Sequence, residues 1–169
     1  MMQVADLFDE LPVADAGPGA ETLRALLAAP LDLRHGWART ERLIDDARRA
    51  LPDRLELNVA MYKLLAYSNR LEAAAELIDE TLAQAARLGG FAADPICLVA
   101  DDPRWAPAAG HARLYLYSLK ALGFVRLRQG QVDAAAQALD QLARLDPGDQ
   151  VGGSVVADML MRVRLPDAA

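Results

Sequence analysis

The sequence predicts an all-α fold built from antiparallel helix pairs. Three features of the chain lead to this prediction. Apolar residues recur at helical spacing along most of its length, glycine and proline separate these stretches, and no stretch shows the alternating Val, Ile and Thr of a half-buried strand. With 169 residues, 53% of them hydrophobic, the chain is long enough for its own core and too short for two typical domains. We therefore expect a single domain of packed helices.

The clearest helix pair lies in residues 119–149. Its first helix has an apolar stripe of Leu119, Leu122 and Leu127, and its second has one of Ala135, Leu139 and Leu142. Gly130 lies in the turn, where a residue without a Cβ lets the chain reverse, and Asp146-Pro147 ends the second helix. We expect Ala135 to face Gly123 or its neighbours one turn away, because small residues there would let the helices approach closely.

Two further helix pairs precede this one. A second copy in residues 55–88 matches the first when Asn69 is aligned with Gly130. The alignment then places Leu71 on Val132, Glu72 on Asp133, Ala74 on Ala135 and Ile78 on Leu139. A third, shorter pair consists of residues 21–29 and a helix that follows His35 and stops at Pro52. The chain thus repeats one supersecondary unit.

In its spacing of Leu, Gly, Ala and Pro, residues 119–149 resemble a tetratricopeptide (TPR) repeat, a unit of 34 residues. The resemblance implies a TPR-like antiparallel helix-pair solenoid of about three repeats, at residues 21–53, 55–88 and 116–149. Residues 1–20 form an acidic N-terminal arm outside the helical domain of residues 21–165, and residues 150–165 form a C-terminal capping helix. Repeats of this kind stack to bury their apolar faces and present a groove to other proteins.

An insertion separates the two best copies. Their turns are 61 residues apart (130 − 69), so 27 residues beyond one repeat length (61 − 34) lie between them, at 89–115. Pro95, Pro103 and Pro107 prevent a long helix there. Its apolar side chains predict an ordered loop docked on the helices: Phe91, Ile96, Leu98, Val99 and Trp105. A structural cover and a binding loop both remain open as its role.

The TPR resemblance also implies where a partner would bind. In such proteins the first helix of each repeat lines a concave groove. The corresponding positions here include Val59, Lys63, Tyr67, Tyr117, Lys120, Phe124 and Arg128. Aromatic and cationic side chains together are typical of protein-binding surfaces. The alternative is that the aromatic members pack inside the protein against the insertion or the C-terminal helix.

Charge and composition restrict the class of partner. A net charge of −6 argues against general nucleic-acid binding, which needs concentrated positive charge. The apolar runs are too short to cross a bilayer, the acidic N-terminus does not resemble a signal peptide, and one cysteine excludes an internal disulfide. We therefore expect a cytoplasmic protein with no membrane or nucleic-acid partner. The acidic residues Asp6, Asp9, Glu10 and Asp15 either are simply solvated or cover the basic groove until a partner displaces them.

No group of residues predicts catalysis. His35 and His111 are far apart in sequence, and neither has a second metal ligand at a suitable spacing. Cys97 has no histidine nearby in sequence, which favours a plain and buried thiol. Asp94, Asp101 and Asp102 fit caps and turns, and Ser154 fits the N-cap of the last helix. We expect no catalytic residue, no cofactor and no metal.

Function is consequently predicted as non-catalytic binding of a protein or peptide segment, as in an adaptor or a chaperone-like assembly factor. A self-associating structural protein is the first alternative, because Met159-Leu160-Met161 exceeds the apolar content that capping needs and suits a homodimer through the C-terminal helix. Residues 61–68, 114–122 and 149–154 are also similar to small TPR-like proteins that accompany nitrogen-fixation genes in proteobacteria, which implies an accessory factor for nitrogenase assembly. A small enzyme with its site in the insertion is the last alternative.

Overall fold

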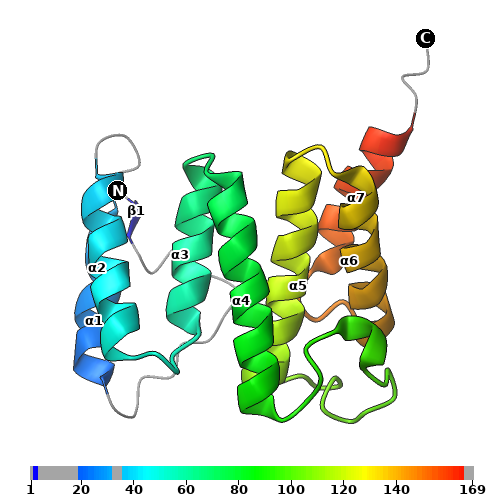
Figure 1. Cartoon of the computed structure of the whole chain (residues 1–169), viewed down its shortest axis with the longest axis horizontal. Helices are drawn as coiled ribbons and strands as arrows, with labels where there is room; N and C mark the ends of the chain where they lie inside the picture. The colour runs from blue at the N-terminus through cyan, green and yellow to red at the C-terminus, as the bar shows by residue number, and fades with distance from the viewer. Residues whose placement is uncertain (1, 4–18, 32–35, 166–169) are drawn as a thin grey trace. The chain divides into compact units, whose positions relative to one another are not determined.

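The computed structural model describes residues 2–3, 19–31 and 36–165 (Figure 1). Within these residues the protein is all-α, as predicted, apart from one antiparallel pair of two-residue strands. The chain divides into two compact units, Met1–Leu77 and Ile78–Ala169. Two predicted features, His35 and the acidic side chains of residues 6–15, lie outside the described residues.

Unit 1 contains three complete helices and the start of a fourth. These are α1 (Ala20–Leu27), α2 (Trp37–Ala50), α3 (Glu56–Tyr67) and the first turns of α4 (Leu71–Gly89). The short strands β1 (Met2–Gln3) and β2 (Pro30–Leu31) pair in register Met2 to Leu31. Helix α2 packs between α1 and α3, and it buries Ile44 and Ala47, the residues of its apolar stripe.

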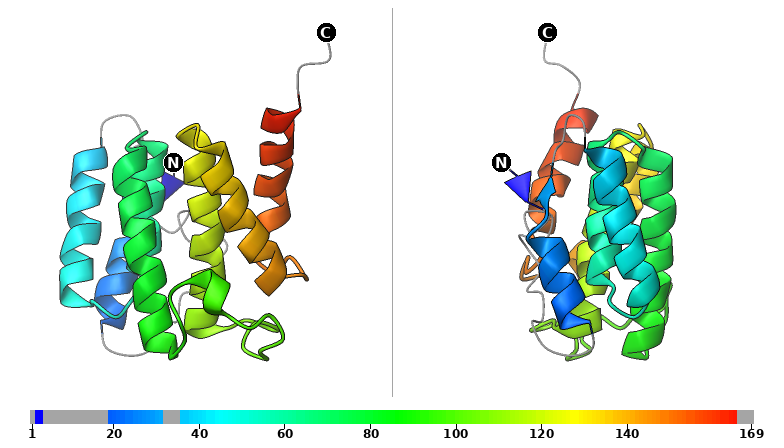
Figure 2. Two further views of the ribbon diagram at one scale, coloured as in Figure 1. Left: turned by 45° about the vertical axis from the view of Figure 1, so that its right-hand side comes forward. Right: turned by 90° about the vertical axis from the view of Figure 1, so that its left-hand side faces the viewer.

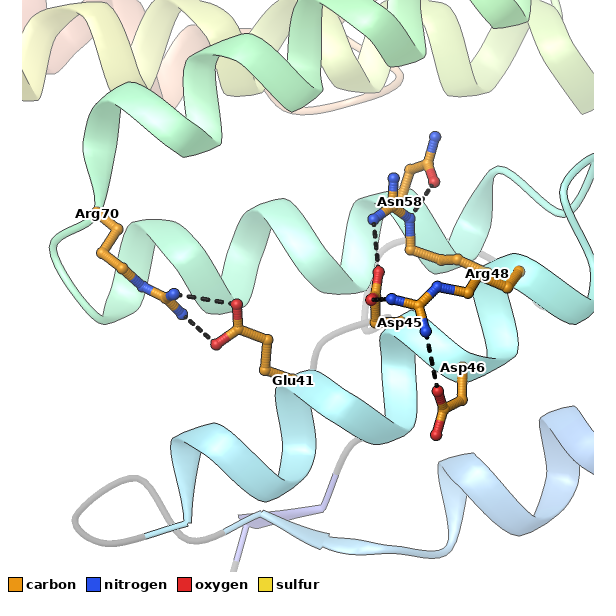
Figure 3. Close-up of polar contacts among 7 residues, drawn as sticks. Glu41, Asp45, Asp46, Arg48, Asn58 and Arg70 are labelled. Carbon is orange, nitrogen blue, oxygen red and sulfur yellow. Dashed lines mark hydrogen bonds and ion pairs between the residues drawn. The ribbon is translucent and has the colours of Figure 1, made fainter.

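Arginines fasten the helices of unit 1 at their surface (Figure 3). Arg70, at the start of α4, forms a two-pronged ion pair with Glu41 of α2, at 3.0 and 2.9 Å. Arg48 of α2 donates from Nε to Oδ1 of Asn58 on α3, at 2.8 Å. The two-pronged pair of Arg70 with Glu41 restricts the geometry of α2 relative to the start of α4, and the bond of Arg48 to Asn58 links α2 to α3.

Unit 2 contains the rest of α4, the 3₁₀ helix η2 (Pro95–Cys97), and the helices α5 (Gly110–Arg128), α6 (Val132–Leu145) and α7 (Gly153–Arg164). Helices α5 and α6 form the most extensive helix contact of the described chain, and α7 packs on both (Figure 2). The predicted capping helix is therefore present, although Asp149 caps it rather than Ser154. Ser154 donates its backbone N–H to Asp149 Oδ1 at 3.0 Å, because the preceding glycines, Gly152 and Gly153, have no side chain that accepts this bond.

A glycine lets α5 and α6 approach closely, and the atoms nearest to it belong to Leu139 of α6. A Cβ on Gly123 would lie 2.7 Å from Cδ2 and 2.8 Å from Cγ of Leu139. Leu139 is one helical turn beyond Ala135, the residue expected to face this glycine or its neighbours. The branched Leu139 side chain reaches across to α5 at this point, and Ala135, one turn earlier, is fully buried.

The turns inside the two best repeats have the same backbone structure. Asn69 and Gly130 both adopt the left-handed conformation, with φ of 61° and 74°. The following residue donates to the carbonyl five positions back in each turn, Arg70 to Leu65 at 2.8 Å and Gln131 to Arg126 at 2.9 Å. Aligning Asn69 with Gly130 therefore matches two turns that are equivalent hydrogen bond by hydrogen bond.

The turns that end α2 and α6 are also equivalent. Leu51 and Asp146 have nearly the same dihedral angles (φ −133°, ψ 64° and φ −124°, ψ 63°), and each precedes a proline. Each donates its N–H to the carbonyl four residues back and accepts a bond from the residue three positions on, Arg54 at 3.0 Å and Asp149 at 3.1 Å. A proline excludes the helical conformation from the residue before it, so the same sequence signal stops both helices in the same way.

Candidate functional site

The residues predicted to line a groove differ in their access to solvent. Val59 and Tyr117 are core residues, 0% and 3% exposed, so their side chains offer no surface to a partner. Tyr67 is 52% exposed and Arg128 is exposed, while the other three members, Lys63, Lys120 and Phe124, are partly buried. A seven-residue groove thus remains a prediction, and at most five of its members have accessible side chains.

On α5, two cationic side chains of the predicted groove stack on two of its aromatic rings. Nζ of Lys120 lies 4.5 Å from the ring centre of Tyr117, and the guanidinium of Arg128 lies 5.8 Å from that of Phe124. These distances are within the range of a cation–π contact. The four residues are therefore organised as two pairs along one helix, an arrangement that spacing alone did not reveal.

The insertion is docked on unit 2, as predicted. Trp105 is 1% exposed and packs edge-on against Phe91, with ring centres 5.3 Å apart. Phe91 in turn packs edge-on against Tyr115 of α5, whose hydroxyl donates to the Ala93 carbonyl at 2.7 Å. Ile96 and Val99 do not follow the prediction, since they are 73% and 67% exposed.

The thiol expected to be buried, that of Cys97, is also exposed. The three outward-facing residues, Ile96, Cys97 and Val99, lie in η2 or shortly after it. Two backbone carbonyls of this segment point toward α6 instead. Arg144 of α6 explains this orientation: it donates from Nη1 to the Leu98 carbonyl at 2.8 Å and from Nη2 to the Pro95 carbonyl at 2.6 Å. The need to satisfy backbone carbonyls against α6 outweighs the burial of two apolar side chains at the surface.

Gln150 fastens the second half of the insertion. Its side chain donates to the Trp105 carbonyl at 2.6 Å and accepts from the Ala108 N–H at 2.8 Å. The carboxylate of Asp146, 4% exposed, holds Gln150 in place by accepting from both its backbone and its side-chain nitrogen at 3.0 Å. A residue predicted only as a helix stop therefore also positions the loop.

A pocket of 510 Å³ opens where the docked insertion meets α4, α5 and α6. Its walls come from four segments: Asp79, Leu82 and Ala83 of α4, residues 93–96 of the insertion, Leu119, Leu122 and Arg126 of α5, and Ala134, Gln137, Ala138, Asp140 and Gln141 of α6. None of the seven predicted groove residues lines it. Its volume is within the usual range of ligand pockets, about 300–1,000 Å³.

Small side chains create the hollow. Ala134, Gln137, Ala138 and Gln141 recur along α6 at intervals of three and four residues, so they share one face of the helix. Because the side chains of Ala134 and Ala138 are single methyl groups, α6 does not fill the space beside α4 and α5. The pocket interior is consequently largely apolar, and three leucines, Leu82, Leu119 and Leu122, are among its lining residues.

Among the charged residues of the pocket lining, acidic groups outnumber basic ones. Asp79, Asp94 and Asp140 contribute three carboxylates against one cation, Arg126. Burial raises the pKa of Asp79, and the nearby Arg126 opposes that shift. Their ion pair is long, 3.4 Å from Nη2 to Oδ2, and Nη1 of Arg126 donates to Gln131 at 3.1 Å. A cation from outside could compete with Arg126 for Asp79.

A second pocket lies beside the insertion and contains the histidine that sequence reasoning considered. His111, in the first turn of α5, lines it together with Asp102 and Arg104. Nε of Arg104 forms an ion pair with Oδ2 of Asp102 at 2.9 Å. Hydrogen bonds from Arg104 lower the pKa of Asp102. Asp94 caps η2 by accepting from the Ile96 N–H, and Asp102 stabilises a turn by accepting from the Arg104 N–H, in keeping with the caps and turns predicted.

The described residues hold neither a metal-binding cluster nor a helix that could span a membrane. Residues 2–3, 19–31 and 36–165 contain no group of His, Cys, Asp and Glu arranged to hold a metal ion. Over the same ranges, no helix combines the length and the apolar composition that crossing a bilayer requires.

Comparisons with protein-family models, with curated proteins and with solved structures found no match for this chain. Its function is therefore inferred from the geometry of the described residues.

Proposed function

We propose that this chain is a non-catalytic protein-interaction module, an adaptor or a chaperone-like assembly factor, that binds a segment of a partner protein in the pocket between α4, α5, α6 and the insertion. The main support for this proposal is the pocket itself, an apolar hollow whose walls are held by packing and hydrogen bonds. Rigid walls favour binding, because little conformational entropy is lost when the partner arrives.

The fold assigned to this module is a TPR-like helical repeat. Its support is the equivalence of the turns at Asn69 and Gly130, and of the helix ends at Leu51 and Asp146. Proteins of this architecture act as scaffolds for partner segments, since each repeat exposes helix faces to neighbours.

The chemistry of the pocket defines the partner segment. Its interior accepts an apolar side chain, and its excess of carboxylates favours flanking lysine or arginine residues. The preferred ligand is therefore an apolar residue between basic ones, carried on a peptide or an exposed helix. This differs from the acidic partner that the cations Lys120 and Arg128 would favour.

Peptide selection tests the proposal. Peptides from a random display library would be selected on the immobilised protein, and their affinities measured by fluorescence anisotropy. We expect the selected peptides to share an apolar residue flanked by Lys or Arg, and to bind more weakly at high salt. Ala83→Phe, which fills the pocket from an exposed position on α4, should weaken binding about tenfold or more.

The matched control is Ala73→Phe, an exposed alanine on the same helix that does not line the pocket. It should leave the affinity unchanged. If Ala83→Phe has no effect while Lys120→Glu with Arg128→Glu abolishes binding, the site is the groove predicted from the TPR resemblance and the pocket proposal is wrong. If no peptide is enriched, the interaction function itself is refuted for linear segments.

A further inference from the structure

Helix α7 has an apolar face that no other element of unit 2 covers. Its inner side, with Gly153, Val156 and Leu160, is buried on α5 and α6. More than half of the large apolar side chains exposed on the described chain belong to α7 or the residue that follows it: Val155, Met159, Met161, Val163 and Leu165. Figure 2 shows α7, in red, with α6 on one side only.

Three of these side chains form one stripe. Val155, Met159 and Val163 follow one another at intervals of four residues, so each is turned only about 40° from the one before. They are 57%, 40% and 59% exposed. Met161 belongs to the opposite edge of the helix, and Leu160 faces inward at 6% exposure. The stripe therefore differs from the Met159-Leu160-Met161 run considered from the sequence.

Two exposed charges of opposite sign lie beside the stripe. Asp158 and Arg162 are four residues apart, and both border its outer edge. If a second α7 packs antiparallel with a two-fold axis at Met159, Asp158 of one copy comes within roughly 3 Å, along the helix axis, of Arg162 in the other. The two-fold symmetry makes this pair twice, whereas parallel packing would place like charges at the same height.

We propose that α7 is a self-association surface, through which two copies of this chain pair antiparallel along Val155, Met159 and Val163. The occupant is a second copy because the charged edge complements itself only when it is reversed. Val155 of each copy then packs against Val163 of the other. A single pair of 12-residue helices is a small interface, so we expect a weak dimer with a Kd of roughly 10 µM or higher.

Sedimentation velocity over a concentration series tests the association. The weight-average mass should rise with concentration from 18.2 kDa toward twice that value. Met159→Glu should abolish the rise. The control is Met161→Glu, the same substitution on the other edge of the helix, which should not change it. Circular dichroism of both variants establishes that the helix content is retained. A constant monomer mass, or equal loss in both variants, overturns the proposal.

Charge exchange and cross-linking test the orientation. Asp158→Arg alone and Arg162→Asp alone should each weaken the dimer several-fold, and the double variant should recover the original affinity. In a Cys97→Ser background, chains with Val155→Cys should form a disulfide with chains carrying Val163→Cys, and not with one another. Cross-linking of Val155→Cys to itself, or failure of the double variant to recover, would show that the antiparallel pairing is wrong.

Discussion

Replacing Gly123 with alanine should destabilise unit 2 although alanine favours helices. The new Cβ would lie 2.7 Å from Leu139 Cδ2 and 2.8 Å from Cγ, where van der Waals contact needs about 3.5 Å or more. Leu139 is 5% exposed, and rotation of its methyl groups does not move Cγ. Overpacking costs about 1–3 kcal/mol, and the helix propensity of alanine offsets about 0.5–1 kcal/mol of this. The net expected loss is about 1 kcal/mol, within a range of about 0–2.5 kcal/mol.

A double-mutant cycle with Leu139→Ala separates the two effects. Leu139→Ala alone should cost about 2–5 kcal/mol, because it leaves a cavity between α5 and α6. In that background the clash is gone, so Gly123→Ala should change sign and stabilise the unit by about 0.5–1 kcal/mol. Gly148→Ala is the control: a Cβ there meets nothing within 4 Å, and the change should be close to neutral.

Tryptophan fluorescence can follow unit 2 alone. The chain has two tryptophans, Trp37 in unit 1 and Trp105 in unit 2, so a Trp37→Phe background leaves only the buried Trp105 as reporter. Urea unfolding of the four variants of the cycle then gives each free energy difference. If Gly123→Ala stabilises unit 2 equally with and without Leu139, the close approach of the helices at this point is refuted.

Three further outcomes are expected. Gly130→Ala should destabilise the protein by about 1–2 kcal/mol in thermal unfolding, and Asn69→Ala should also destabilise it, since alanine adopts a left-handed φ only with strain. Burial, and to a lesser extent the charge of Asp94, raises the pKa of Tyr115 above its usual 10.0. Tyr115 therefore ionises more readily in the unfolded chain, and the urea midpoint should fall as the pH rises above 10. The fall should be smaller in Tyr115→Phe. The hydrogen bond from Ser154 lowers the pKa of Asp149 below 3.8, so its stabilisation is present above that pH and lost as acid protonates it; a similar acid profile in Asp149→Asn would contradict this.

Local signals in the sequence were enough to predict the helices. Proline after Leu51 and Asp146, and the left-handed residues Asn69 and Gly130, act through the backbone of their immediate neighbours, so their effect does not depend on distant packing. The repeat alignment starts from two of these positions, Asn69 and Gly130, and Pro52 and Pro147 end helices in the first and last repeats.

The pocket could not be predicted because it depends on residues that are distant in sequence. Arg144 places the insertion, and its bond to Pro95 spans 49 residues. The only local trace was the repeat of small residues on α6, Ala134 and Ala138, which reads equally well as helix packing. Helical spacing also could not separate Tyr117 and Val59, which are buried, from Tyr67, which is exposed.

The anchors of the insertion also determine when it can fold during synthesis. Residues 90–109 leave the ribosome before α5 and α6, yet their hydrogen bonds go to Arg144 and Gln150, across 49 and 42 residues. Until those residues have emerged and the α5–α6 hairpin has closed, the Trp105 side chain lacks the partners that bury it. The pocket wall therefore forms only after α5 and α6 have emerged. A nascent chain halted just before Arg144 would expose this apolar loop to chaperones and proteases.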